Sequence, residues 1–438
     1  FITATTSKNI ILDQNNVFTT TVTMKAGTGG SLAFNDITFK DSDGVRLHSS
    51  AASNGDLFIN AGTDLAVSGD LIITATTGNI TQGAALTVTG GGASTFTTSA
   101  SNGTITLAHV DNTFTGAVAL NTNGSSGNAT IKNDRALLLA ASSVGGAFSA
   151  TATAGNITQN GALTITGTTT LVTIGQGATI DLAANGTGNA FTSQLLITTN
   201  ETGSDKDAHT TIDGGTTNLI LGNSTIDGNL TLLSGGTITD TNGSTVTVQG
   251  TLTATTDASA SVITLNDLAV TGAFTLAPAD TAAVTIVTPA GLILAASTMG
   301  GTFSGTATTG DISDSGALAI TGNSIFTAAD TQSVILNNNN SFTGAVTFAA
   351  LSGNLKNVTI TNTMALDLAA ITLAQVASSG GNLNVTTSGA LTDSGALVIP
   401  GTTTITATGQ VVDLDHTSNN FATILFGSSS NAVSSVEV

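Results

Sequence analysis

The feature that most constrains this chain is a phrase that recurs along it at nearly constant intervals. Residues 78–90 read GNITQGAALTVTG, and residues 155–167 read GNITQNGALTITG. Related copies surround Ile238, Ile312 and Leu391, so the five copies follow one another at intervals of 77, 81, 74 and 79 residues. A chain with such a period folds as a stack of similar units, because no single unit can bury its apolar face alone.

Two further phrases keep the same order within each repeat. Residues 112–117 (NTFTGA) match residues 340–345 (NSFTGA), and residues 137–142 (LLLAAS) match residues 292–297 (LILAAS). We expect the repeated apolar side chains to form the core, with each phenylalanine stacking on its copies or on their neighbours. The predicted core positions are Phe18, Phe114, Phe191, Phe342, Phe421, Ile80, Ile157, Ile238, Ile312 and Leu391.

Apolar and polar residues alternate throughout the repeats, which is typical of strands with one buried face. The sequence therefore predicts an all-β fold, an elongated right-handed parallel β-helix (β-solenoid) with coils of about 20 residues and about four coils per repeat. We divide it into a divergent first repeat (1–65), four repeat units (66–154, 155–235, 236–309 and 310–388) and a partial last repeat (389–438). All six form one continuous solenoid in this interpretation.

Composition narrows the possible functions. Only 8% of residues are charged, the net charge is −19, and the chain has no Cys, Trp or Tyr. An acidic chain with two arginines cannot assemble a basic surface for nucleic acid, and its charge opposes binding to anionic membranes. No apolar run is long enough for a transmembrane helix. The lack of Cys, together with much Thr, Gly and Asn, favours a secreted or bacterial cell-surface protein. Because the chain begins at Phe1 without Met, we expect it to be a processed or partial chain.

The three phrases together resemble the filamentous-haemagglutinin-like large exoproteins of bacteria, including their β-strand-repeat relatives. The resemblance covers nearly the whole chain and is clearest over residues 66–425. It implies a long β-helical adhesin fibre, anchored to or released from the cell surface, that serves attachment, aggregation or biofilm formation. Its expected partners are other copies of itself, surface glycans, and host or neighbouring cells.

Candidate metal and catalytic residues are few. The four histidines, His48, His109, His209 and His416, show no metal-ligand spacing. Oxygen ligands for Ca²⁺ could come from acidic loops, with Asp205, Asp207 and Asp213 as weak candidates beside residues 41–44 and 413–416. Solvated loops are the favoured interpretation of all these clusters. We therefore predict no cofactor and no catalytic residue.

Three functions stay open at this point. The first is an adhesin segment whose Thr, Ser and Asn side chains bind weakly at many places along the surface. The second is a subunit of a self-assembling extracellular filament joined by terminal strands, for which residues 1–11 are a candidate. The third is a carbohydrate-active enzyme, for which Asp311 and Asp314 are the available carboxylate pair. Thr-x-Thr triplets also suggest ice binding, but the later repeats have lost one or both threonines of the triplet.

Overall fold

The computed structural model describes residues 2–3, 8–18, 22–26, 35–42, 45–48, 56–59, 65–184, 188–200, 205–376, 378–427 and 432–438. The regular structure of these residues consists of strands, β1 to β54, and includes no α-helix. The chain divides into two compact units, Phe1–Asn229 and Leu230–Val438. Each unit is a parallel β-solenoid, and together they make about 17 turns. The predicted fold class is therefore confirmed.

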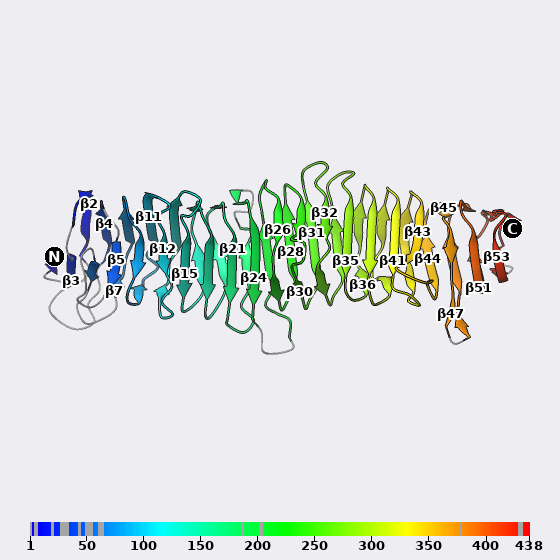
Figure 1. Ribbon diagram of the computed structural model, residues 1–438, viewed down its shortest axis with the longest axis horizontal. Helices are drawn as coiled ribbons and strands as arrows, with labels where there is room; N and C mark the ends of the chain where they lie inside the picture. The colour runs from blue at the N-terminus through cyan, green and yellow to red at the C-terminus, as the bar shows by residue number, and fades with distance from the viewer. Residues whose placement is uncertain are drawn as a thin grey trace. The chain divides into compact units, whose positions relative to one another are not determined.

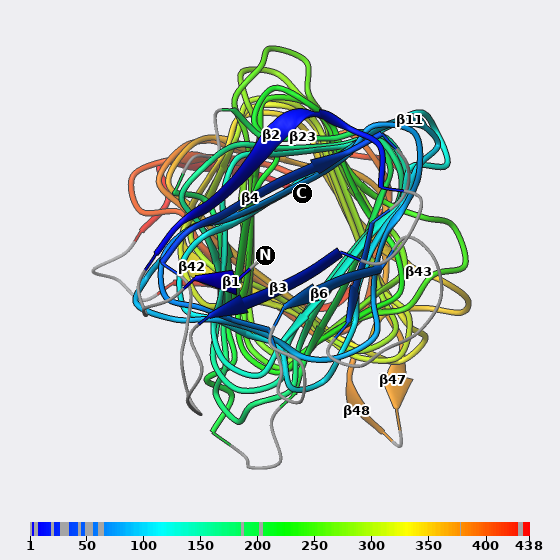
Figure 2. The same cartoon turned by 90° about the vertical axis from the view of Figure 1, so that its left-hand side faces the viewer.

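The first unit shows how successive turns stack. In one wall, β8 (Leu71–Ala75), β11 (Ser94–Ser101) and β14 (Val118–Asn123) pair in parallel register. The view in Figure 2 shows β2 (Ile10–Asn16) and β4 (Ile37–Asp41) on one side of the unit and β3 (Val22–Ala26) and β6 (Asp56–Ile59) on the other. β11 thus lies between the corresponding strands of the turns before and after it, and Figure 1 shows strands of successive turns side by side in this way.

Turn length varies within this unit, because loops of different length connect strands in a constant register. Ala129 pairs with Phe148, a separation of 19 residues (148 − 129), whereas Ile37 pairs with Leu71, a separation of 34 (71 − 37). The longer of these turns contains an additional strand in one wall, where β5 (Val45–His48) and β6 pair with each other between β3 and β9 (Ile80–Gln82).

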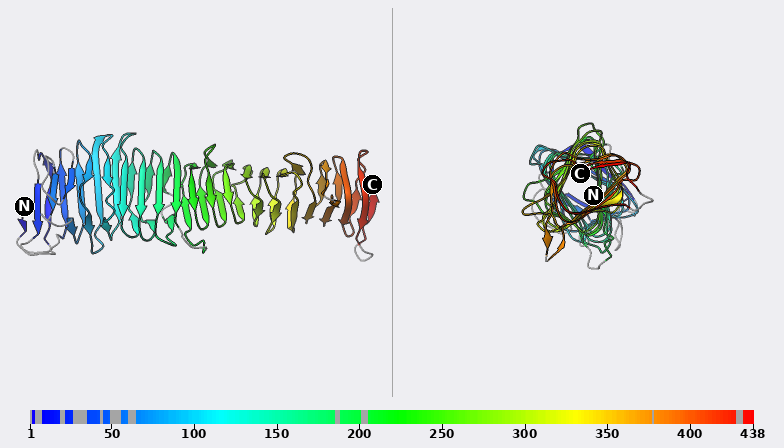
Figure 3. Two further views of the ribbon diagram at one scale, coloured as in Figure 1. Left: turned by 60° about the horizontal axis from the view of Figure 1, so that its bottom comes forward. Right: turned by 90° about the vertical axis from the view of Figure 1, so that its right-hand side faces the viewer.

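The second unit follows the same scheme. One wall contains β28 (Leu230–Ser234), β31 (Leu252–Thr256) and β34 (Phe274–Ala277). The other contains β32 (Ile263–Leu265), β35 (Val284–Thr288), β38 (Phe303–Ala307), β41 (Ser324–Ala328) and β43 (Val346–Ala350). Figure 3 shows these strands side by side, one turn after another.

The sequence repeat takes three and a half turns, not the four predicted. In the second unit, seven successive strand pairings lead along one wall from Ile238 in β29 (Ile238–Asp240) to Leu391 in β50 (Leu391–Asp393), two repeats later. Ile312, one repeat from each, lies in β39 (Ile312–Asp314) in the opposite wall. Successive copies of a phrase therefore alternate between the two walls, and copies on one wall lie about 34 Å apart at about 4.8 Å per turn.

Inward-facing side chains form a continuous apolar core in each unit. Eight of the ten predicted core positions are buried, with exposed fractions of 2% or less: Phe114, Phe191, Phe342, Ile80, Ile157, Ile238, Ile312 and Leu391. Two of these phenylalanines, Phe114 and Phe342, contact aromatic side chains other than their own copies. Phe96 meets Phe114 edge to face, and Phe326 contacts Phe303, Phe342 and Phe348 with ring centroids 5.4–5.9 Å apart.

The other two predicted core residues, Phe18 and Phe421, are partly exposed. Phe18 follows β2 and stacks on Phe39 at 5.5 Å, and Phe421 lies in β53 (Asn420–Phe426). Among the described residues, β2 pairs only with β4 and β53 only with β51 (Leu397–Thr406). A turn that is covered on one side buries its aromatic side chain incompletely.

The segment proposed as a donated strand, residues 1–11, pairs within its own unit where it is described. Ile2 pairs with Lys25 of β3, and Ile10 and Ile11 pair with Ile37 and Thr38 of β4. Phe1 and residues 4–7 lie outside the described residues.

Phe326 provides a test of the aromatic core. Replacing Phe326 with Ala should lower the free energy of unfolding by about 3–5 kcal/mol, because it removes a fully buried ring that contacts three others. Urea denaturation with amide hydrogen exchange at β41 measures the effect. The adjacent Ile325→Ala is the matched control, since Ile325 is 42% exposed and should cost far less. Equal losses from both variants would contradict the assigned register.

Candidate functional site

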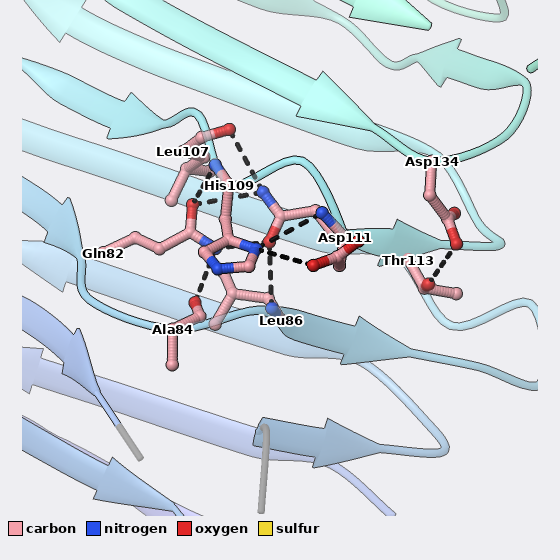
Figure 4. Close-up of polar contacts among 9 residues, drawn as sticks. Gln82, Ala84, Leu86, Leu107, His109, Asp111, Thr113 and Asp134 are labelled. Atoms are coloured by element: carbon pink, nitrogen blue, oxygen red, sulfur yellow. Dashed lines mark hydrogen bonds and ion pairs between the residues drawn. The ribbon is translucent and has the colours of Figure 1, made fainter. Parts of the chain in front are cut away.

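A recurrent cluster of polar residues lies at corners of the solenoid, around the asparagine that stands two residues before a repeated phenylalanine such as Phe114. Asn112 is fully buried. Its Oδ1 accepts a hydrogen bond from the Leu86 N–H (2.9 Å), and its Nδ2 donates to the Leu107 carbonyl (3.1 Å) and to Gln82 Oε1 (3.1 Å). Gln82 Nε2 in turn donates to Asn112 Oδ1 and to the Ala84 carbonyl. Figure 4 shows this asparagine corner, with Gln82 and Leu86 coming from the preceding turn.

The asparagine corner recurs with one variation in its partner. Asn189 forms the same reciprocal pair with Gln159 and accepts from the Leu163 N–H. In two later repeats an aspartate replaces the glutamine: Nδ2 of Asn340 donates to Asp314 Oδ2, and Nδ2 of Asn419 donates to Asp393 Oδ2, both at 2.7 Å. At these four corners the Asn side chain thus joins two turns of the solenoid.

A second buried side chain, one turn further on, binds the backbone of the phenylalanine itself. Asn133 Oδ1 accepts from the Phe114 N–H (2.8 Å), and its Nδ2 donates to the Phe114 and Ala136 carbonyls. Asn362 repeats the arrangement at Phe342. Asp41 accepts from the Phe18 N–H, and Thr217 from the Phe191 N–H. A buried backbone N–H without a partner is costly, so these side chains stabilise each corner.

A third set of side chains caps the residue that precedes a strand. Asn79 Oδ1 accepts the Thr104 N–H, one turn on, at 2.8 Å. His209 does the same through Nδ1, which accepts the Asn229 N–H at 3.0 Å. The same contact is made by Asp36, Asp70, Asn128, Asn156, Asp311, Asn323 and Asn357. Asparagine and aspartate therefore act as axial links between turns.

The two carboxylates considered as a catalytic pair, Asp311 and Asp314, make capping and corner contacts of the kinds described above. Asp311 accepts the Ser333 N–H, and Asp314 is buried and accepts from Asn337, Asn338 and Asn340. The two carboxylates thus hold backbone and amide donors of the next turn.

The histidines are engaged in turns. Nδ1 of His109 accepts the Asp111 N–H at 3.2 Å, as Figure 4 shows, and Nδ1 of His416 accepts the Ser418 N–H at 3.2 Å. His48 ends β5 (Val45–His48), and its side chain lies outside the described residues. Near His109, Arg135 forms a hydrogen-bonded ion pair with Asp134, which lowers the pKa of that carboxyl.

The weak metal candidates do not form a cation site in the described part of the chain. Asp205 and Asp207 are exposed in the loop before β25 (Thr210–Asp213), and Asp213 Oδ1 accepts the Gly215 N–H at 2.8 Å. Asp41 is buried in its corner, and Asp43 and Gly44 lie outside the described residues. Among described residues, no three His, Cys, Asp or Glu side chains gather as metal ligands would.

Sequence reasoning missed the buried asparagines. It assigned Asn to the outer surface, yet Asn112, Asn133, Asn189, Asn340 and Asn362 have exposed fractions of 2% or less. A signal was present, since Asn precedes the repeated phenylalanine by two residues at Phe18, Phe114, Phe191, Phe342 and Phe421. A surface residue needs no such fixed spacing.

The outer surface of the walls carries columns of hydroxyl groups. In the second unit, Thr239, Thr264, Thr285 and Ser304 occupy registered, partly exposed positions on four successive turns. The hollows on the described surface are shallow. One of about 360 Å³ lies beside Phe191 and Asn218, and another of about 210 Å³ lies beside Asp267.

Comparison with known proteins identifies one family. A family model described as repeats of unknown function (DUF5649) matches residues 35–121, 126–198, 207–279, 281–349 and 355–426. The chain belongs to this family. No curated protein and no solved structure matches it. Across its described residues, the chain holds no helix with the length and apolar character needed to cross a bilayer.

The corner asparagines of DUF5649 repeats can be tested at Asn133. Asn133→Ala should lower the free energy of unfolding by about 2–4 kcal/mol, because it leaves several buried groups of Phe114 and Ala136 unpaired. Asn133→Asp should also destabilise, since it replaces a donor that faces two carbonyls. Urea denaturation measures both. The exposed Asn123→Ala is the control, and a loss as large from that variant would contradict the assignment.

Substitutions of His209 test the capping contact, in which its Nδ1 accepts the Asn229 N–H of the next turn. His209→Asn should retain the stability of the native chain, because asparagine makes the same contact at Asn79 and Asn128. His209→Ala should lose about 1 kcal/mol, the contribution of one hydrogen bond. Hydrogen exchange of the Asn229 amide reports the cap directly. Exchange at the same rate in the Ala variant and the native chain would disprove it.

Proposed function

We propose that this chain is a stretch of an extracellular, bacterial surface fibre that acts as an adhesin or as part of a biofilm matrix. The observation that carries the proposal is the column of hydroxyl side chains on successive turns, formed in the second unit by Thr239, Thr264, Thr285 and Ser304. Such columns offer both donors and acceptors at regular spacing, and they suit a partner rich in hydroxyl groups, such as a surface glycan. Binding is weak at each turn and gains strength from the number of turns engaged.

The engagement of the candidate carboxylates favours this proposal over an enzyme. Both oxygens of the buried Asp314 accept hydrogen bonds from the next turn, and Asp311 Oδ1 accepts the Ser333 N–H. A glycoside hydrolase needs two carboxyl groups free to face a substrate across a groove. The solenoid is a fold that hosts many functions, so the choice depends on these residues and not on the architecture.

The proposed mechanism predicts how adhesion depends on salt and on hydroxyl count. Retention of beads coated with the full chain on a neutral-polysaccharide surface should change little between low and high ionic strength, because exposed charges contribute little to it. Retention should fall stepwise as Thr239, Thr264 and Thr285 are replaced by Val, singly and then together. Flow-chamber detachment measures it.

The matched control replaces the same three threonines with Ser, which keeps each hydroxyl and should keep retention. Loss of all retention from one substitution would point to a single site and contradict distributed binding. Unchanged retention in the triple Val variant would contradict a role for this column.

A further inference from the structure

The third repeat departs from the others at its corner. In four repeats, three residues connect the two corner strands: β9 (Ile80–Gln82) ends at Gln82 and β10 (Leu86–Val88) begins at Leu86, and the later corners keep this spacing. In the third, β29 ends at Asp240 and β30 (Val246–Val248) begins at Val246, which leaves five residues. Gly243 adopts a positive φ of 77° in this longer turn. The two additional residues therefore lie in a connection that has the same length in the other four repeats.

The corner side chains change at the same place. Leu268 stands where the other repeats carry the buried asparagine, and Val270 replaces the phenylalanine. Without the amide, Asp240 accepts the Asn266 and Asp267 N–H groups through one oxygen, Oδ2. Burial raises the pKa of Asp240, and the nearby negative charge of Asp267 raises it further. This corner is therefore less completely paired than its counterparts.

Two more side chains at this corner, Asp267 and Ser244, each have an oxygen with no hydrogen-bond partner among the described residues. Asp267 Oδ2 accepts the Gly243 N–H at 2.8 Å, and within residues 205–376 its Oδ1 has no hydrogen bond. Ser244 is 9% exposed, and its Oγ has no hydrogen-bond partner among the described residues. This Oγ is closed off from solvent, so Asp267 and Asn266 supply the polar groups of this corner that line the adjoining hollow and can reach a ligand.

A hollow of about 210 Å³ opens beside these groups. Ser244, Asn266 and Asp267 line one side of it, and Val287, Pro289 and Thr308 of the next turns line the other. It is smaller than the roughly 300–1,000 Å³ pockets that enclose drug-sized molecules, and it suits a single small ring. A hexopyranose has the matching chemistry: hydroxyl groups for Asp267 and Asn266, and an apolar ring face for Pro289 and Val287.

We propose that this hollow, formed at the divergent corner of the third repeat, binds one neutral hexose unit of a polysaccharide. The proposal rests on the proposed adhesive function and gives it one defined subsite among the distributed contacts. Asp267 accepts from sugar hydroxyls, and the uncompensated carboxylates of Asp240 and Asp267 disfavour acidic sugars. The lining of this subsite is particular to the third repeat, because the other four corner connections have three residues and carry asparagine where Leu268 stands here.

Saturation-transfer difference NMR on the full chain tests the proposal, with the methyl glycosides of glucose, galactose and mannose as probes and methyl glucuronide as the acidic comparison. We expect transfer to at least one neutral glycoside and none to the glucuronide. Asp267→Ala should reduce the transfer at least fivefold. Thr308→Phe, which fills the hollow from an exposed position, should abolish it without touching the corner hydrogen bonds. Asp257→Ala, an exposed aspartate of the same unit, is the matched control and should leave it unchanged.

No transfer to any neutral glycoside would overturn the proposal, as would transfer that survives both Asp267→Ala and Thr308→Phe. The bead assay separates this failure from failure of the adhesive function. Retention of the native chain on the neutral polysaccharide, with no transfer to any neutral glycoside, would reject the subsite alone. Glycoside binding without retention would reject distributed adhesion alone.

Discussion

The stacking of each turn on the next through parallel backbone hydrogen bonds is the constraint on which the rest of this structure depends. It requires every turn to present the same strands in the same register, as Leu71, Ser94 and Val118 do in the first unit. Inward positions then become a column of apolar side chains, and outward positions become a column of small polar ones. Pairing between turns satisfies the backbone N–H and carbonyl groups. A chain with only 8% charged residues can therefore adopt this fold.

Backbone pairing fails where a turn bends, and there the chain uses side chains in its place. Asn112 and Asn133 supply both a donor and an acceptor to neighbouring turns, which no apolar residue could do. Aspartate can substitute where only donors face it, as Asp314 does. Aspartates such as Asp311 and Asp314 therefore link turns of the solenoid, and a hollow also opens beside the corner that lacks its asparagine.

The alternation of apolar residues predicted strands, and the repeated phrases predicted a stacked solenoid with most of its core. The number of turns per repeat could not be predicted, because turn length varies from 19 to 34 residues (148 − 129 and 71 − 37) and the longest of these turns contains an additional strand. Side-chain polarity misled the assignment of Asn133, since hydropathy does not reveal that a buried amide has partners. Phe421 matched the pattern of the buried phenylalanines, but its burial depends on the neighbouring turns and not on its own phrase.

Distances between spin labels test the stacking most directly, because the chain has no native Cys to interfere. Labels on Thr239 and Thr347 span five pairings of one wall, and labels on Thr239 and Thr392 span seven. Double electron–electron resonance should give narrow distributions near about 24 Å and about 34 Å, a rise of about 4.8 Å per turn. Equal distances, or a shorter distance for the second pair, would contradict one turn per strand pairing and the three-and-a-half-turn repeat built on it.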